Sequence, residues 1–123
     1  LKQFKGEWEY NTDWKMINGH PKKAGWINAI QEAQKTVQKG IDLGCPVLVM
    51  SSNKSFPETK EWNNEYLSSD IVLDVHDIQK YGQKLGNYVT RDTIQNGIHD
   101  LILSEKDSRD HVYRTVFDWL PGK

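Results

Sequence analysis

The sequence has few of the features that mark specialised classes of protein. Cys45 is the single cysteine among 123 residues, so no disulfide can form within the chain, and we expect Cys45 to be a small buried hydrophobic residue. The 16 basic and 17 acidic residues nearly cancel and are spread along the chain, which argues against a nucleic-acid partner. The longest apolar run, residues 46–50, is too short to span a membrane, and no segment resembles a signal peptide. We therefore expect a cytoplasmic protein.

The length of 123 residues fits one domain or part of one. The chain begins with Leu1 rather than Met, and both a proteolytic fragment and a natural short protein stay open as interpretations. Residues 1–24 are rich in aromatic side chains, and the alternation from Trp8 to Tyr10 suits a short strand. Large aromatic side chains need a cover, so this arm is expected to pack on a surface elsewhere in the protein.

Hydrophobic periodicity predicts helices that alternate with strands. Helices are expected at residues 25–39, 75–85 and 107–120, and strands at residues 46–50 and 88–94. The apolar run 46–50 is continuous, as is typical of a strand covered on both faces of a parallel sheet. Strands separated by helices form βαβ units, so the expected fold class is α/β with a parallel sheet.

Two polar side chains follow the two predicted strands. Asp70 ends the polar connection after the first strand, and His99 lies in the loop after the second strand. Functional sites of parallel sheets lie beyond the carboxyl ends of the strands, so both residues are expected on one rim. His99 would accept and return a proton, Asp70 would orient its imidazole, and Gly97 would let the backbone turn tightly before it. The plainer alternatives are a surface-loop histidine and a capping aspartate.

Other acidic residues near Asp70 compete for the same role. Asp74 is the alternative acid, and Asp77 is a further one, although each could instead cap the helix that begins there. Together with Asp70 and His76 they also offer oxygen and nitrogen ligands for a metal. Helix geometry places His76 off the face that Asp74 and Asp77 share, and no second histidine lies at a ligand spacing. We therefore expect no metal at this segment.

No G-x-S-x-G segment, the usual turn around a nucleophilic serine, occurs in the chain. Ser51 and Ser52 follow the first predicted strand, but Met50 and Asn53 flank them where small residues would be needed. They are expected to be loop residues that orient the acidic segment. His20 and His111 have no companion motif and are expected to be solvated.

These segments resemble the C-terminal half of the α/β-hydrolases. The closest group contains serine aminopeptidases, monoacylglycerol lipases and lysophospholipases. The likeness covers residues 25–120, and its most specific part is D-x-V-L-D-V at residues 70–75 followed by G-x-H-D-L-x-L-S at residues 97–104. The last helix, with Phe-Asp-Trp-Leu at residues 117–120, is also similar to that of the group.

The resemblance implies a partial α/β-hydrolase fold. Residues 1–24 would be an arm returning from the cap region, and residues 25–123 the C-terminal part of the core domain. Asp70 would be the triad acid, with Asp74 as the alternative, and His99 the triad histidine. The nucleophilic serine and the oxyanion hole would lie upstream, so the chain alone would be inactive. The full-length parent would be a carboxylic-ester or amide hydrolase, with small acyl-ester or lipid-like substrates, and it would need no cofactor.

Two other interpretations stay open. The chain would be a stand-alone α/β module that binds a small molecule or a partner, or a degenerate hydrolase fold that serves as an interaction scaffold. The completeness of the sheet discriminates between a hydrolase fragment and a stand-alone module, because parallel strands need neighbours and only two strands are predicted. A fragment would stay bound to the N-terminal half of the same hydrolase, exchange elements or form a homodimer.

Overall fold

The computed structural model describes residues 10–11, 13–14, 19 and 21–120. The chain divides into two compact units, Leu1–Ala33 and Gln34–Lys123. The boundary falls inside helix α1, Ala24–Lys39, which begins within one residue of the predicted position and carries no buried residue. Most of the aromatic arm, including Trp8, lies outside the described residues, so its predicted strand and its origin from a cap stay predictions.

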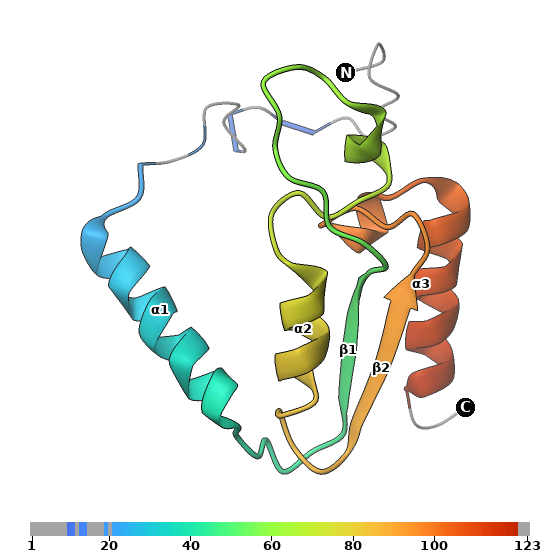
Figure 1. Cartoon of the computed structure of the whole chain (residues 1–123). Coiled ribbons are helices and arrows are strands. Elements are labelled where there is room, and N and C mark those ends of the chain that lie inside the picture. Colours follow the sequence, from blue (N-terminus) through green and yellow to red (C-terminus); the bar gives the residue numbers. More distant parts are fainter. Residues whose placement is uncertain (1–9, 12, 15–18, 20, 121–123) are drawn as a thin grey trace. The chain divides into compact units, whose positions relative to one another are not determined.

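The second unit has mixed α/β character. Its main elements follow one another as strand β1 (Val47–Ser52), helix α2 (Val75–Gly82), strand β2 (Val89–Ile94) and helix α3 (Lys106–Trp119) (Figure 1). The two strands are parallel, with Val47 opposite Val89 and Ser52 opposite Ile94. Two short 3₁₀ helices, η2 (Asn64–Leu67) and η3 (Leu101–Leu103), lie in the connections. The prediction of an α/β chain with parallel strands is confirmed.

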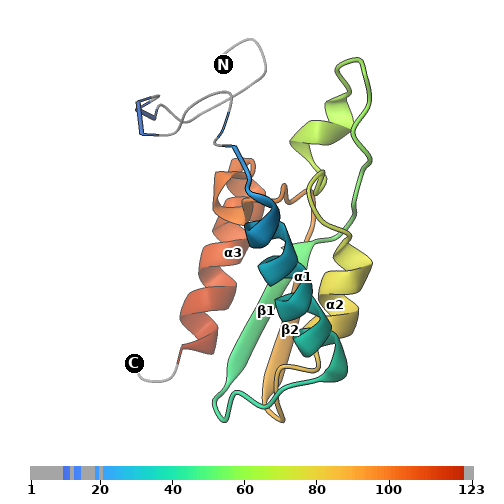
Figure 2. The same ribbon diagram turned by 90° about the vertical axis from the view of Figure 1, so that its left-hand side faces the viewer.

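Helices α2 and α3 lie on opposite sides of the two-stranded sheet (Figure 2). On one side, a Cβ on Gly82 of α2 would stand 2.8 Å from Cγ1 of Val49, so only glycine allows this close approach. On the other side, Thr115 of α3 donates a hydrogen bond to Asp92 of β2. Successive residues of a strand point to opposite faces of the sheet. Asp92 is paired in register with Met50, the residue after Val49, so Asp92 and Val49 lie on opposite faces and meet different helices.

Two element ends differ from the sequence predictions by more than one residue. Strand β1 continues to Ser52 because Ser51 and Ser52 pair with Thr93 and Ile94, so these serines are buried strand residues rather than loop residues. Helix α2 ends at Gly82 instead of residue 85. The backbone then turns, and the carbonyl of Lys84 accepts a hydrogen bond from Ile41 in the segment before β1.

The expectation for Cys45 is wrong. Its side chain is exposed. The strand begins only at Val47, and Cys45 lies before it in a bend in which Gly44 has a positive φ of 65°. The thiol therefore stays outside the packed sheet.

Candidate active site

The backbone of Asp70 is joined to the chain that leaves β1. The N–H of Asp70 donates to the carbonyl of Lys54 at 3.0 Å, and the N–H of Phe56 donates to the carbonyl of Asp70 at 2.9 Å. Ser55 and Asp70 thereby form a parallel bridge beyond the end of the sheet. At the base of the intervening loop, Glu65 accepts hydrogen bonds from the Lys54 ammonium and the Ser69 hydroxyl. The loop thus returns Asp70 to the carboxyl end of β1.

The Asp70 carboxylate is buried and fully engaged. Its side chain is 3% exposed. Oδ1 accepts the N–H groups of Val72 and Leu73 at 2.8 and 2.9 Å, and Oδ2 lies 3.0 Å from Nδ1 of His99. Burial would raise the pKa of Asp70, but the hydrogen bonds from Leu73, His99 and Val72 outweigh it and hold the pKa below its ordinary value. The carboxylate is therefore ionised at neutral pH.

The loop that carries His99 turns sharply after β2. The left-handed residue of this turn is Asn96, with φ 55°, and the N–H of Gly97 donates to the carbonyl of Ile94 at 3.2 Å. A Cβ on Gly97 would lie 2.8 Å from Cδ2 of Leu101 and 3.2 Å from the carbonyl oxygen of Ile94, so a side chain there would force its neighbours to shift. The sequence predicted that Gly97 provides the tight turn. In the structure Asn96 takes the left-handed conformation, and Gly97 permits the close approach of the following segment.

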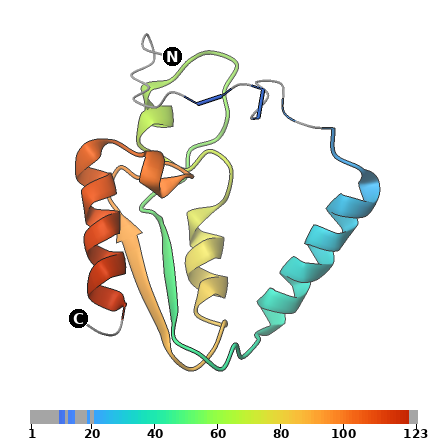
Figure 3. The same ribbon diagram turned by 180° about the vertical axis from the view of Figure 1, so that it is seen from behind.

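Asp70 and His99 meet beyond the carboxyl ends of both strands, with Nδ1 and Oδ2 3.0 Å apart. Figure 3 shows that the segments following β1 and β2 leave the sheet at the same end. An ionised carboxylate only accepts hydrogen bonds, so the proton of the neutral imidazole resides on Nδ1. Nε2 then carries the lone pair. Since the His99 side chain is 44% exposed, its ring can be reached by a reacting group. A buried acid that orients a histidine in this tautomer is the arrangement of a general base.

The competing acids occupy other places. Asp74 is the N-cap of α2, and its carboxylate accepts the N–H of His76 at 2.8 Å. Asp77 lies exposed in the first turn of the same helix. Of the three aspartates, Asp70 is the one that meets His99. Within the described residues, no three His, Cys, Asp or Glu side chains group together as metal ligands would, and no helix has the length and apolar character to cross a membrane.

Both serines at the end of β1 use their hydroxyls locally. Ser51 donates to the carbonyl of Ser52 at 3.0 Å and accepts from the Gln79 amide at 2.7 Å. Ser52 donates to the carbonyl of Lys54 at 3.0 Å. These hydroxyl protons bond to backbone carbonyls. Ser52 therefore shapes the start of the segment that leads to Asp70.

A second pair of acid and histidine joins α3 to β2. Nε2 of His111 lies 3.0 Å from Oδ2 of Asp92, and Thr115 donates to the same oxygen at 2.7 Å. His111, expected from the sequence to be solvated because it lacks a companion motif, is 38% exposed and has Asp92 as a partner. Its signal in the sequence is the four-residue spacing of His111 and Thr115, which places both on one face of a helix. His20 lies outside the described residues.

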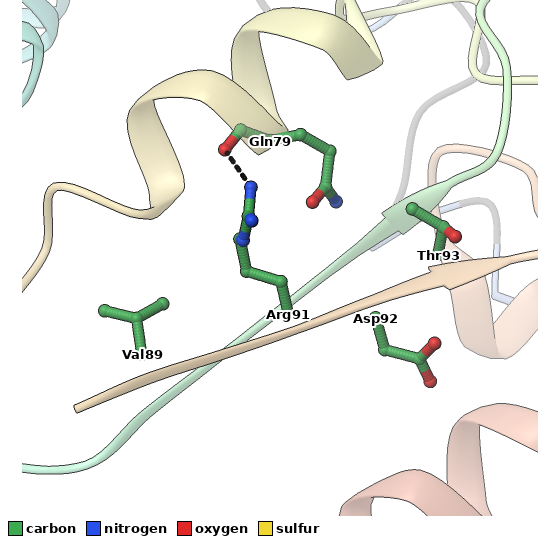
Figure 4. A pocket seen from close by; sticks show the side chains of 5 residues that line it. All are labelled: Gln79, Val89, Arg91, Asp92 and Thr93. Atoms are coloured by element: carbon green, nitrogen blue, oxygen red, sulfur yellow. Dashed lines mark hydrogen bonds between the residues drawn. The ribbon is translucent and has the colours of Figure 1, made fainter.

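A polar pocket of about 450 Å³ lies beside β2 (Figure 4). It is lined by Gln79, Val89, Arg91, Asp92 and Thr93. Arg91 reaches toward α2 and donates to the carbonyl of Gln79 at 3.2 Å, whereas Asp92 points to the other face (Figure 4). Asp70 and His99 do not line this pocket, so the chemistry of the pair and the pocket are separate features.

No family model matches the chain, and no curated protein or solved structure matches it either. The interpretation of the site therefore depends on its residues and their geometry.

Proposed function

We propose that this chain is the C-terminal part of a serine hydrolase of the α/β-hydrolase type, in which Asp70 and His99 are the triad acid and histidine. The contact between Oδ2 of Asp70 and Nδ1 of His99, at 3.0 Å, carries the proposal. Two further features support it. The acid is buried and ionised, and its contact with Nδ1 leaves Nε2 of His99 for proton transfer.

The order of the elements supports the same assignment. A parallel strand, an acid, a helix, a second parallel strand, a histidine and a final helix follow one another along the chain. In α/β-hydrolases the acid likewise precedes the histidine, and both follow the serine. The resemblance of residues 70–75 and 97–104 to the group of serine aminopeptidases, monoacylglycerol lipases and lysophospholipases suggests an ester hydrolase with small acyl-ester or lipid-like substrates.

The nucleophile and the oxyanion hole would come from an upstream half of the same hydrolase. Strand β1 gives a physical reason to expect such a half. Its apolar residues 47–50 are only partly buried, although a continuous apolar run is typical of a strand covered by neighbours. In the part of the chain that the structure describes, the sheet has two strands, so one edge of β1 is open to a further strand. The isolated chain would then be inactive.

In the proposed reaction Nε2 of His99 takes the proton of the upstream serine while the serine oxygen bonds to the acyl carbon. His99 then gives this proton to the leaving oxygen as the ester C–O bond breaks. Water repeats both steps and releases the acid. Asp70 stays ionised throughout, holds the imidazole in one tautomer and stabilises the imidazolium that forms.

The test is labelling of the complete gene product with a fluorophosphonate, which bonds to an activated serine and releases fluoride. We expect an adduct on a serine outside the 123 residues of this chain. His99→Ala should slow labelling about 1,000-fold or more, because the serine loses its base. His111→Ala is the matched control, since His111 also pairs with an aspartate, and it should label within about threefold of the unmodified protein.

Two outcomes would overturn the proposal. Labelling of Ser51 or Ser52, or an unchanged rate in His99→Ala, would show that the triad assignment is wrong. A folded gene product that takes no label in any form would favour the second candidate, a non-catalytic α/β module that binds a small molecule or a partner.

A further inference from the structure

Ser104 closes the loop that carries His99. The N–H of Ile98, the residue directly before His99, donates to the Ser104 hydroxyl oxygen at 3.0 Å. Ser104 is 2% exposed, so water has little access to replace this acceptor. Arg109 of α3 donates to the carbonyl of Ser104 at 3.1 Å and so anchors the serine to the helix. The backbone before His99 is thereby fixed through a buried hydroxyl.

Two other hydrogen bonds that join this loop to side chains act farther from the histidine. Ser108 donates to the carbonyl of Gln95 at 2.6 Å, and the N–H of Asn96 donates to the Asn53 side chain at 3.0 Å. Both hold the first residues after β2. The bond to Ser104, in contrast, fixes the peptide group that leads into His99.

The histidine depends on this backbone support. Asp70 is held by two backbone N–H groups whether or not His99 is present, but the His99 side chain is 44% exposed. Its ring reaches Asp70 only while its backbone stays in place. A partly buried amide that loses its acceptor is unfavourable, so the loop would open to let water reach Ile98. Such an opening would move His99 away from the carboxylate.

We propose that Ser104 is a positioning residue for His99: its hydroxyl holds the peptide before the imidazole so that Nδ1 meets Asp70. The catalytic meaning of this role rests on the proposed hydrolase function. The positioning itself is a property of this chain, and it can be measured without turnover.

The experiment uses the ¹⁵N-labelled chain and two NMR signals, the Nδ1–H of His99 and the exchange rate of the Ile98 amide. In Ser104→Ala we expect the Nδ1–H signal to weaken or vanish and the amide to exchange about fivefold faster or more. Ser51→Ala is the matched control, because Ser51 is equally buried but its hydroxyl bonds to Gln79. It should change neither signal. Ser104→Thr keeps a hydroxyl and should restore both.

Unchanged signals in Ser104→Ala, or equal losses in Ser51→Ala, would overturn the proposal. If Ser104→Ala does not fold, the exchange rate of the Ile98 amide in the unmodified chain tests the proposal. Slow exchange supports the positioning role of Ser104, and free exchange contradicts it. The result is independent of the labelling test. Intact NMR behaviour without fluorophosphonate labelling would reject the hydrolase function and leave the positioning role.

Discussion

The second unit contains two pairs of aspartate and histidine with the same separation. Oδ2 of Asp70 lies 3.0 Å from His99, and Oδ2 of Asp92 lies 3.0 Å from His111. The pairs differ in the ring atom, since His99 uses Nδ1 and His111 uses Nε2. They also differ in burial, because the side chain of Asp70 is 3% exposed and that of Asp92 is 26% exposed.

The difference shows which features distinguish a candidate base from a structural contact. Two backbone N–H groups hold Asp70 in place without help from its histidine. Asp92 instead shares one oxygen between His111 and Thr115, both on α3, and this contact ties the helix to the sheet. Distance alone would rank the pairs equally. The ring nitrogen that is used, and the other partners of the acid, separate them.

Among the substitutions that test this difference between the two pairs, Asp70→Asn should have the largest effect on the His99 tautomer and on the labelling rate. The amide oxygen can still accept from Val72 and Leu73, but the NH₂ group then faces Nδ1 of His99. Nδ1 must become an acceptor, which moves the ring proton to Nε2 and removes the base. We expect the tautomer change in ¹⁵N spectra of the chain. Labelling of the complete gene product should slow about 1,000- to 10,000-fold.

Asp92→Asn is the matched control for this substitution. It alters the other pair in the same way, and labelling should stay within about threefold of the unmodified protein. An unchanged His99 tautomer in Asp70→Asn would contradict the assignment of Nδ1 as the bonded atom. A large loss in Asp92→Asn would mean that the two pairs act together.

The sequence predicted the end of the sheet at which the candidate site lies, because that position follows from local patterns. Apolar runs and helical stripes located β1, α2, β2 and α3, and the connections then placed Asp70 and His99 at the carboxyl ends of the strands. The choice of Asp70 over Asp74 needed the structure. Both follow the same loop, and the structure shows that the Asp70 carboxylate is buried against His99 whereas Asp74 caps α2.

Contacts between distant residues could not be predicted in this way. His111 and Asp92 are separated by a strand end, a loop and a helical turn, so no local pattern joins them. The bond from Ile98 to Ser104 depends on the path of the loop through η3. Cys45 looked like a core residue because the apolar run follows it directly, but its exposure depends on where the strand begins. Tertiary packing decides each of these features.

Acid should lower the free energy of unfolding by protonating Asp70, an effect smaller than that of Asp70→Asn on labelling. The pKa of Asp70 in the folded chain lies below the ordinary value of 3.8, so the ionised carboxylate stabilises the fold at neutral pH. This contribution is complete above the unfolded pKa and disappears as the pH falls through the folded one. Each unit of difference corresponds to about 1.4 kcal/mol of unfolding free energy.

Two measurements check this pH dependence. A ¹³C titration of the Asp70 carboxyl should give a midpoint below 3.8. Urea unfolding between about pH 6 and pH 2 should show that Asp70→Asn lacks part of the acid destabilisation seen in the unmodified chain. A midpoint at or above the ordinary value would mean that burial outweighs the hydrogen bonds to the carboxylate.

Thr115→Val should have the smallest effect, and it tests whether the two pairs are independent. The substitution removes one donor to Asp92, while His111 and solvent remain as partners because the carboxylate is partly exposed. We expect a loss of about 0.5–1 kcal/mol in urea unfolding and no change in the Nδ1–H signal of His99. Thr90→Val is the matched control, because Thr90 is exposed and lies on the same face of β2 as Asp92. A changed His99 signal in Thr115→Val alone would show that the contact between α3 and β2 also supports the Asp70 pair, and the separation of the two pairs would fail.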